Sequence, residues 1–77
     1  QAEIIHAQVL KSSKLINKNI EDAEFPNGLR VGLIKKDDKI IIPDKETKIE
    51  INDEILFLCM SEDIKKAEEL FQVRSEY

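Results

Sequence analysis

Residues 54–60 read EILFLCM, and the six residues from Ile55 to Met60 are apolar without interruption. A strand with one face in water alternates apolar and polar residues, whereas this run makes both faces of a strand apolar. It therefore predicts a central strand that is covered on both sides. Leu56, Leu58 and Met60 are the candidate residues for the core or for a dimer interface.

The segment after this strand, SEDIKKAEELF (61–71), has the pattern of an amphipathic helix. Ser61 is a suitable N-cap residue, and the two acids that follow it favour the start of a helix through the helix dipole. Apolar residues recur at the spacing of a single helix face, which is expected to pack on the sheet. This face consists of Ile64, Ala67, Leu70 and Phe71.

The segments before the strand supply the remaining elements. EIIHAQVL (3–10) predicts a strand with Ile5, Ala7 and Val9 on one face. NKNIEDA (17–23) has an N-cap residue and apolar residues three positions apart, which predicts a helix of about two turns. KKDDK (35–39) predicts a hairpin, and the isoleucines at 40–42 predict its return strand. IEI (49–51) is expected to point two side chains inward.

A Pro-Asn-Gly corner at 26–28 joins the predicted helix to the strand before the hairpin. Pro26 presets φ for a turn, and the Asn and Gly that follow it tolerate positive φ. The alternation after the corner places Leu29, Val31 and Leu33 on one face of that strand. Gly32 inside the strand suggests a close approach of backbone or of a ligand, although a bulge is the commoner cause.

These elements predict an α+β fold: one domain over residues 1–77 with the order β-α-β-β-β-α, a mostly antiparallel sheet and two helices on one face. Two short helices cannot cover both faces of a sheet whose central strand is apolar on both sides. We therefore expect a second copy across a two-fold axis to cover the other face. The sequence starts with Gln1 and not with Met, and we expect a domain excised from a longer chain.

The composition excludes several functions. The formal net charge is −4 and no basic stripe appears, so nucleic acid is not expected as a partner. His6 is the only histidine and Cys59 the only cysteine, and no metal-ligand spacing, catalytic triad or phosphate-binding loop is present. We expect His6 to be a surface or interface residue and Cys59 a buried, unreactive thiol. The sequence therefore predicts no enzyme, no metal and no cofactor in this domain.

Several segments, in this order, resemble the TrkA-C domain, the C-terminal lobe of proteins that regulate potassium conductance (RCK proteins). The family's corner motif DLP-G appears as EFPNG (24–28), and its strand motif V-x-A-I-x-R appears as VGLIKK (31–36). The motif T-x-I-x-x-G-D-x-hydrophobic appears as TKIEINDEI (47–55), with Asn52 in place of the usual glycine. The final LF-V appears as LFQV (70–73), so the resemblance extends over nearly the whole chain.

The resemblance implies a cytosolic regulatory module, peripheral to the inner face of the membrane, that forms a homodimer or a higher ring. In such proteins a Rossmann lobe, which binds NAD or ATP, precedes this domain. The ring then controls a membrane potassium transporter and so controls potassium uptake. Two alternatives stay open: a regulatory lobe of another cation transporter or antiporter, and a purely structural dimerisation module.

The corner is also where the resemblance implies a ligand. Some relatives bind cyclic di-AMP at the dimer interface through an Asp-x-Arg motif and a later Asn. Here the region reads Glu24, Phe25, Pro26 and then Arg30, so the arginine of the motif is missing. We expect any small ligand, whose identity the sequence does not give, to contact Glu24, Arg30 and Gly32.

Overall fold

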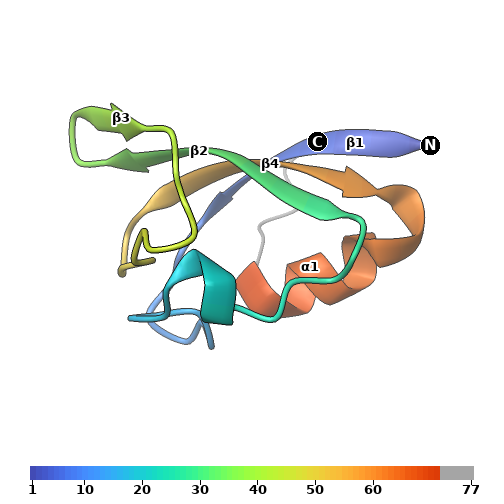
Figure 1. Ribbon diagram of the computed structural model, residues 1–77. Coiled ribbons are helices and arrows are strands. Elements are labelled where there is room, and N and C mark those ends of the chain that lie inside the picture. Colours follow the sequence, from blue (N-terminus) through green and yellow to red (C-terminus); the bar gives the residue numbers. More distant parts are fainter. Residues whose placement is uncertain (72–77) are drawn as a thin grey trace.

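The computed structural model describes residues 1–71, which form a four-stranded antiparallel sheet with a helical layer on one face (Figure 1). The strands are β1 (Ala2–Gln8), β2 (Leu29–Lys36), β3 (Lys39–Ile41) and β4 (Glu54–Met60), in the spatial order β1-β4-β2-β3. The helical elements are the 3₁₀ turns η1 (Ile20–Asp22) and η2 (Ser61–Asp63) and the helix α1 (Ile64–Phe71). The expected α+β fold is confirmed. Residues 72 and 73 of the LFQV motif lie outside the described residues.

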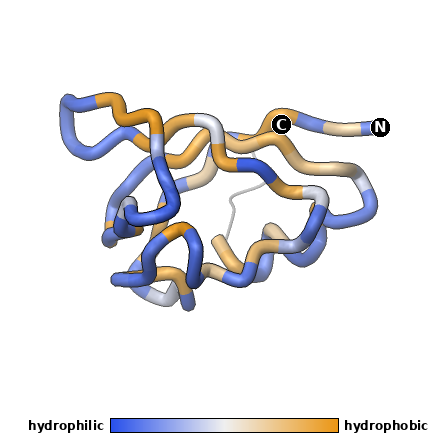
Figure 2. Tube along the Cα trace, viewed as in Figure 1, coloured by the Kyte–Doolittle hydropathy of each residue, from blue (hydrophilic) through white to orange (hydrophobic). Residues whose placement is uncertain are grey.

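The apolar segment 54–60 forms β4, which lies between β1 and β2 as its sequence predicts. All seven residues of β1 pair antiparallel with β4. Ile55, Phe57 and Cys59 are buried against the helical layer. Hydrophobic residues follow the strands, while hydrophilic residues dominate the β2–β3 hairpin tip and the loops of the helical layer (Figure 2).

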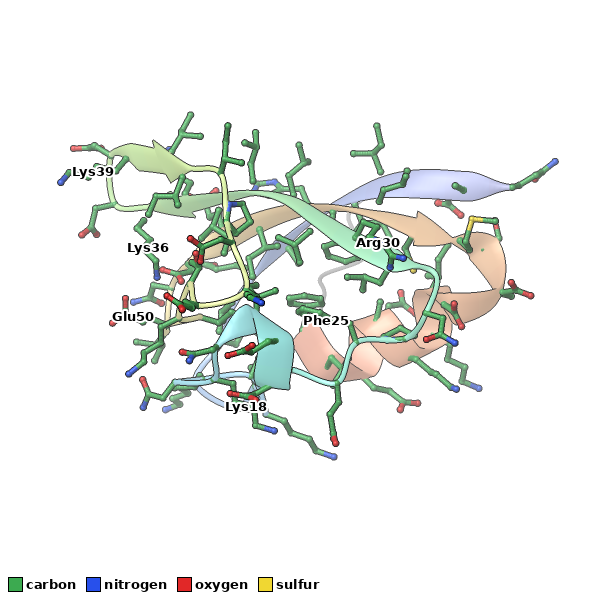
Figure 3. The ribbon with its side chains drawn as sticks, in the orientation of Figure 1. Lys18, Phe25, Arg30, Lys36, Lys39 and Glu50 are labelled. Carbon is green, nitrogen blue, oxygen red and sulfur yellow. The ribbon has the colours of Figure 1, made fainter. Side chains whose placement is uncertain are left out.

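A stack of three aromatic rings joins the sheet to the helical layer. The ring centroids of Phe57 in β4 and Phe71 in α1 lie 4.7 Å apart, and those of Phe71 and Phe25 lie 5.8 Å apart. Phe25 lies between η1 and the sheet (Figure 3). Ala67 and Phe71 are buried, and Ile64 and Leu70 pack against the core, so the predicted apolar face of α1 is confirmed.

The first predicted helix is a single 3₁₀ turn and not two turns over 17–23. The loop before β4 takes up the backbone donors of this segment: Ile20 N–H donates to the carbonyl of Thr47 at 2.9 Å, and Asn17 N–H donates to that of Ile49 at 2.7 Å. Asn17 also has a φ of 66°, which an α-helix excludes. Pairing with the loop therefore overrides a local helix signal that was too short to be stable alone.

A β-bulge at Gly32 changes which residues of β2 face the core. Val31 and Leu33 pair with two consecutive residues of β4, so Gly32 has no partner of its own. Leu29 is buried against the helical layer, whereas Leu33 lies on the opposite face and Ile34 takes the inward position. The expectation that Leu33 shares the face of Leu29 was wrong, because the bulge inserts one residue into the alternation.

Three turn details also differ from expectation. Asn27 and Gly28 do not adopt positive φ, and the close approach of neighbouring side chains is what requires glycine at 28. Ser61 does not cap the helix, because the chain enters α1 through η2, of which Ser61 is the first residue. Ile49 is buried but Ile51 is exposed, so this segment points one side chain inward and not two. Positive φ occurs at Asn17, Glu24, Asp37 and Asn52.

Candidate functional site

The sheet face opposite the helical layer, here named the open face, is covered by no helix of the described residues (Figure 1). It is apolar over most of its length. Leu33 is partly buried, and the other apolar side chains on this face are exposed by 37% (Met60) to 68% (Ile4 and Ile40). Ile42, just after β3, is 83% exposed. The apolar residues of the open face are Ile4, Leu33, Ile40, Leu56, Leu58 and Met60.

The three candidate interface residues all lie on the open face. Leu56, Leu58 and Met60 are 37–47% exposed, so they are not part of the core of the single chain. Their alternative role, in a dimer interface, stays a prediction. Leu33 is a member that the sequence pattern missed, because the bulge at Gly32 turned it outward.

A groove of about 580 Å³ runs beside the first half of β2. The groove is open because β3 pairs only with residues 34–36 of β2. Among the described residues, the edge of β2 before residue 34 has no neighbouring strand on this side. Glu24 and Arg30, two of the predicted ligand residues, both line the groove, together with Pro43. Gly32, the third, does not line it: it lies at the bulge, where an added Cβ would stand 3.4 Å from the carbonyl oxygen of Leu56.

The charges of the groove are mixed. Its lining includes three carboxylates and two cationic side chains, which are Glu21, Glu24, Asp44, Arg30 and Lys45. Arg30 Nη1 donates to the carbonyl of Asn27 at 3.0 Å and to that of Leu29 at 2.9 Å, so this guanidinium is tied to the corner (Figure 3). The groove therefore presents apolar walls with a slight excess of negative charge.

A charge network at the opposite end of the sheet fixes the turn before β4 (Figure 3). Lys36 Nζ donates to a carboxylate oxygen of the buried Asp53 and to Oε1 of Glu50, the latter at 2.9 Å. Asp53 also accepts the backbone N–H of Glu50 at 2.8 Å. Burial lowers the pKa of Lys36, but its hydrogen bonds to Asp53 and Glu50 outweigh this, so the pKa is raised overall. The hydrogen bond from Lys36 lowers the pKa of Glu50.

This network was not expected from the sequence, although the Asp of the T-x-I-x-x-G-D motif is its centre. Its groups satisfy one another, which is typical of a structural ion pair. Over residues 1–71, no three His, Cys, Asp or Glu side chains lie together as a metal site requires. The helices of that same range are too short or too polar to cross a membrane.

Comparison with known proteins places these features in a family. The sequence profile of the TrkA-C domain matches residues 5–72. The chain is 28% identical over 75 residues to the Trk system potassium uptake protein TrkA of Azorhizobium caulinodans, and 32% identical over 72 residues to TrkA homolog 2 of Methanosarcina mazei. These matches cover 97% and 94% of this chain but only 16% of each relative.

Solved structures share the fold. The C domain of the potassium transport protein KtrA, in complex with c-di-AMP, has a TM-score of 0.76 at 21% identity and covers 90% of this chain and 82% of its own. The RCK_C domain dimer of S. agalactiae BusR, also with c-di-AMP, has a TM-score of 0.76 at 22% identity, with 92% and 91% covered. With a family profile that spans almost all of its length and the same sheet and helix arrangement, the chain belongs to the TrkA-C domain family.

Proposed function

We propose that the chain is a regulatory domain of a potassium-uptake system and performs no catalysis of its own. Membership of the TrkA-C family supports this role, because the curated relatives are Trk system potassium uptake proteins. The structural observation that carries the proposal is the open face, an apolar sheet face with no helix over it in the described chain. A regulatory domain that acts through assembly requires such a surface.

The open face is proposed to bind the same face of a second copy. Contiguous apolar patches mark interaction sites, and a two-fold axis allows one patch to cover itself. Complete burial of an exposed Leu or Ile side chain contributes roughly 1.5–3 kcal/mol. Half-exposed side chains such as Leu58 contribute less, so the whole face is needed to offset the entropy lost on association. The BusR neighbour is described as an RCK_C domain dimer, which supports this assembly.

The groove at Glu24 and Arg30 is proposed to take a small ligand, and we keep Gly32 as a predicted contact at its margin. The KtrA and BusR neighbours were solved with c-di-AMP. The groove in this chain lacks the arginine of the Asp-x-Arg motif and carries more carboxylates than cations. A dianionic dinucleotide meets repulsion there, so we expect c-di-AMP to bind weakly and a neutral or cationic ligand to bind better.

The chain spans 16% of the length of its curated relatives, so the context of the domain is part of the proposal. We infer a cytoplasmic protein peripheral to the inner face of the membrane, in which a Rossmann lobe that binds NAD or ATP precedes residues 1–77. A homodimer or a higher ring would then act on a membrane potassium transporter. A regulatory lobe of another cation transporter or antiporter, and a structural dimerisation module without a ligand, are the alternatives.

Sedimentation equilibrium of the 77-residue chain tests the assembly. We expect a dimer, and we expect Leu58→Glu to raise the dissociation constant by about 30-fold or more, which corresponds to about 2 kcal/mol at the centre of an interface. Ser12→Glu adds the same carboxylate to an exposed loop and should leave the constant unchanged. A chain that stays monomeric at several hundred micromolar contradicts the proposed assembly.

An NMR titration with c-di-AMP, ATP, K⁺ and Mg²⁺ tests the ligand site in the same protein. Chemical-shift changes centred on Glu24 and Arg30 would support the groove. Changes confined to the end of the sheet that holds Lys36 would refute its placement. No response to any of these compounds, in a chain that dimerises, would favour the structural dimerisation module.

A further inference from the structure

One end of the open face carries a polar cluster that crosses three strands. His6 Nε2 in β1 lies 3.1 Å from Oε1 of Glu54 in β4, and Nζ of Lys35 in β2 lies 4.0 Å from Oε2 of the same carboxylate. The strand register explains this arrangement. Lys35 is the direct cross-strand partner of Glu54, and His6 is two residues from Gln8, the partner of Glu54 in β1. The side chains are 37–63% exposed, so water solvates the cluster in the single chain.

The cluster borders an apolar hollow of about 270 Å³ on the open face. The wall from β3 is Ile40, which carries no charge. Among the described residues, the charged groups that face His6 from the neighbouring strands are therefore Glu54 and Lys35. The hollow is lined by His6, Leu33, Lys35, Ile40, Glu54 and Leu56.

The net charge of this cluster depends on one proton. The carboxylate of Glu54 and the ammonium of Lys35 cancel, so the cluster is neutral while the His6 ring is neutral and carries +1 when the ring is protonated. Imidazoles gain a proton near pH 6.5 in model peptides, whereas Glu and Lys side chains titrate well outside the range from pH 5.5 to 7.5. His6 is the only histidine of the chain, so no other imidazole contributes in that range.

We propose that acidification weakens the association of two open faces, because protonation of His6 places an uncompensated positive charge in each half of the interface. This inference rests on the dimer proposed above. In the single chain, water solvates the added charge. In the dimer the charge loses part of that water, and the two copies bring like charges into one interface of low dielectric. The dimer therefore favours the neutral ring.

Proton linkage sets the size of the effect. If the dimer accepted only neutral rings, the dissociation constant would rise by at most about tenfold per histidine for each pH unit of acidification. The limit for the two histidines of a dimer is therefore about 100-fold per pH unit. Attraction between Glu54 and a protonated ring offsets part of this, so we expect the constant to rise by about tenfold or more between pH 7.5 and 5.5.

Sedimentation equilibrium at pH 7.5 and 5.5 tests the inference, with far-UV circular dichroism of the same samples as the check on the monomer fold. His6→Gln keeps an N–H donor for Glu54 but takes up no proton, so its dissociation constant should be equal at both pH values. Lys35→Met leaves a cluster that is negative with a neutral ring and neutral with a protonated one. The pH response of Lys35→Met should therefore reverse, with tighter association at pH 5.5.

Lys39→Met is the matched control, because it removes the same charge from the hairpin tip (Figure 3). Lys39 pairs with Lys36 and alternates with Ile40, the partner of Lys35, so it lies on the opposite face of the sheet from the cluster. This variant should respond to pH as the unmodified chain does. If the unmodified chain forms a dimer with equal dissociation constants at both pH values, this inference is wrong but the proposed dimer stands. The same conclusion follows if the pH response persists in His6→Gln. A chain that is monomeric at both pH values overturns the dimer itself.

Discussion

Replacing Gly28 with alanine should destabilise the domain by about 2 kcal/mol. Gly28 N–H donates to Oδ2 of Asp63 at 3.0 Å, and the Gly28 carbonyl accepts the N–H of Met60 at 3.0 Å. A Cβ added at this position would overlap the same Asp63 oxygen and would lie 2.8 Å from Cγ of Met60. Gly28 does not have a positive φ, so the cost comes from this overlap and not from backbone strain.

The magnitude follows from three effects. Forcing one extra carbon into a packed site costs about 1–3 kcal/mol. If Asp63 moves away to make room, a hydrogen bond to a charged group is lost, which costs about 1.5–3 kcal/mol. Alanine also lowers the conformational entropy of the unfolded chain relative to glycine, which stabilises the folded state by about 0.4–1 kcal/mol. A net loss of about 2 kcal/mol lowers the melting temperature of a domain of this size by roughly 10 °C.

Urea unfolding followed by far-UV circular dichroism measures the effect, and Gly32→Ala provides a matched control. A Cβ at Gly32 would meet only the carbonyl oxygen of Leu56 at 3.4 Å, so this variant should stay within about 0.5 kcal/mol of the unmodified chain. Adding Asp63→Ala to Gly28→Ala should cost less than the sum of the two single changes, because both act on one contact. Equal stabilities for the two glycine variants would refute the steric reasoning.

Four further predictions concern Lys36, Ser13 and Cys59. Lys36→Met should cost about 2 kcal/mol in urea unfolding, because it removes the ammonium that pairs with the buried Asp53, while Lys39→Met at the hairpin tip should change stability by less than about 0.5 kcal/mol. Because the pKa of Lys36 is raised, the pair should stabilise the fold fully below about pH 10.4 and lose that contribution as pH rises through the raised pKa, which alkaline titration of stability checks. Ser13→Ala removes a hydroxyl that donates at 2.8 Å to a carbonyl near the end of α1, and a loss of about 1–2 kcal/mol is expected. Burial raises the pKa of the Cys59 thiol, so a disulfide reagent should label the folded chain slowly, and rapid labelling without unfolding would contradict its burial.

Features encoded by neighbouring residues were predictable. The uninterrupted run from Ile55 to Met60 correctly predicted that β4 lies at the centre of the sheet. The expected cover on both sides is not present in the described part of the single chain, because Leu56, Leu58 and Met60 are 37–47% exposed on the open face. The hairpin followed from two charged turn residues, of which Asp37 takes a φ of 53°. The helix α1 followed from one apolar stripe. In each case a short stretch carries enough information, because periodicity or turn chemistry decides the conformation without a partner segment.

Features that depend on distant segments were not predictable. The segment 17–23 has a helix signal, but three of its backbone N–H groups donate to carbonyls of the loop at 45–49. No local sequence pattern predicts that pairing. The bulge at Gly32 was open to two explanations, and only the register against β4 shows that it turns Leu33 outward. The pairing of Lys36 with Asp53 likewise joins two segments that the sequence places far apart.

In the candidate site, too, contacts between residues close in sequence were predictable, and contacts that depend on strand register were not. Glu24 and Arg30 line one groove because both flank the corner at 26–28, so their proximity is local. Gly32 does not line it, because the bulge lies in the part of β2 that follows. His6 was expected at a surface or an interface, and its contacts to Glu54 and Lys35 depend on the register of three strands. A single sequence does not fix that register.

The two faces of β4 separate folding from assembly. Phe57 stacks on Phe71 and is 1% exposed, so replacing it with alanine removes core packing, at a cost of about 3–5 kcal/mol. Leu58, the next residue, is 47% exposed and contributes little to the core of the single chain. A charge at Leu58 should therefore weaken association by about 30-fold or more while the monomer stays folded, whereas any loss of association in Phe57→Ala should accompany unfolding. Residues 55–60 are all apolar, so the sequence does not show which face of β4 belongs to the core and which is free for association. The side of the sheet on which α1 packs determines this.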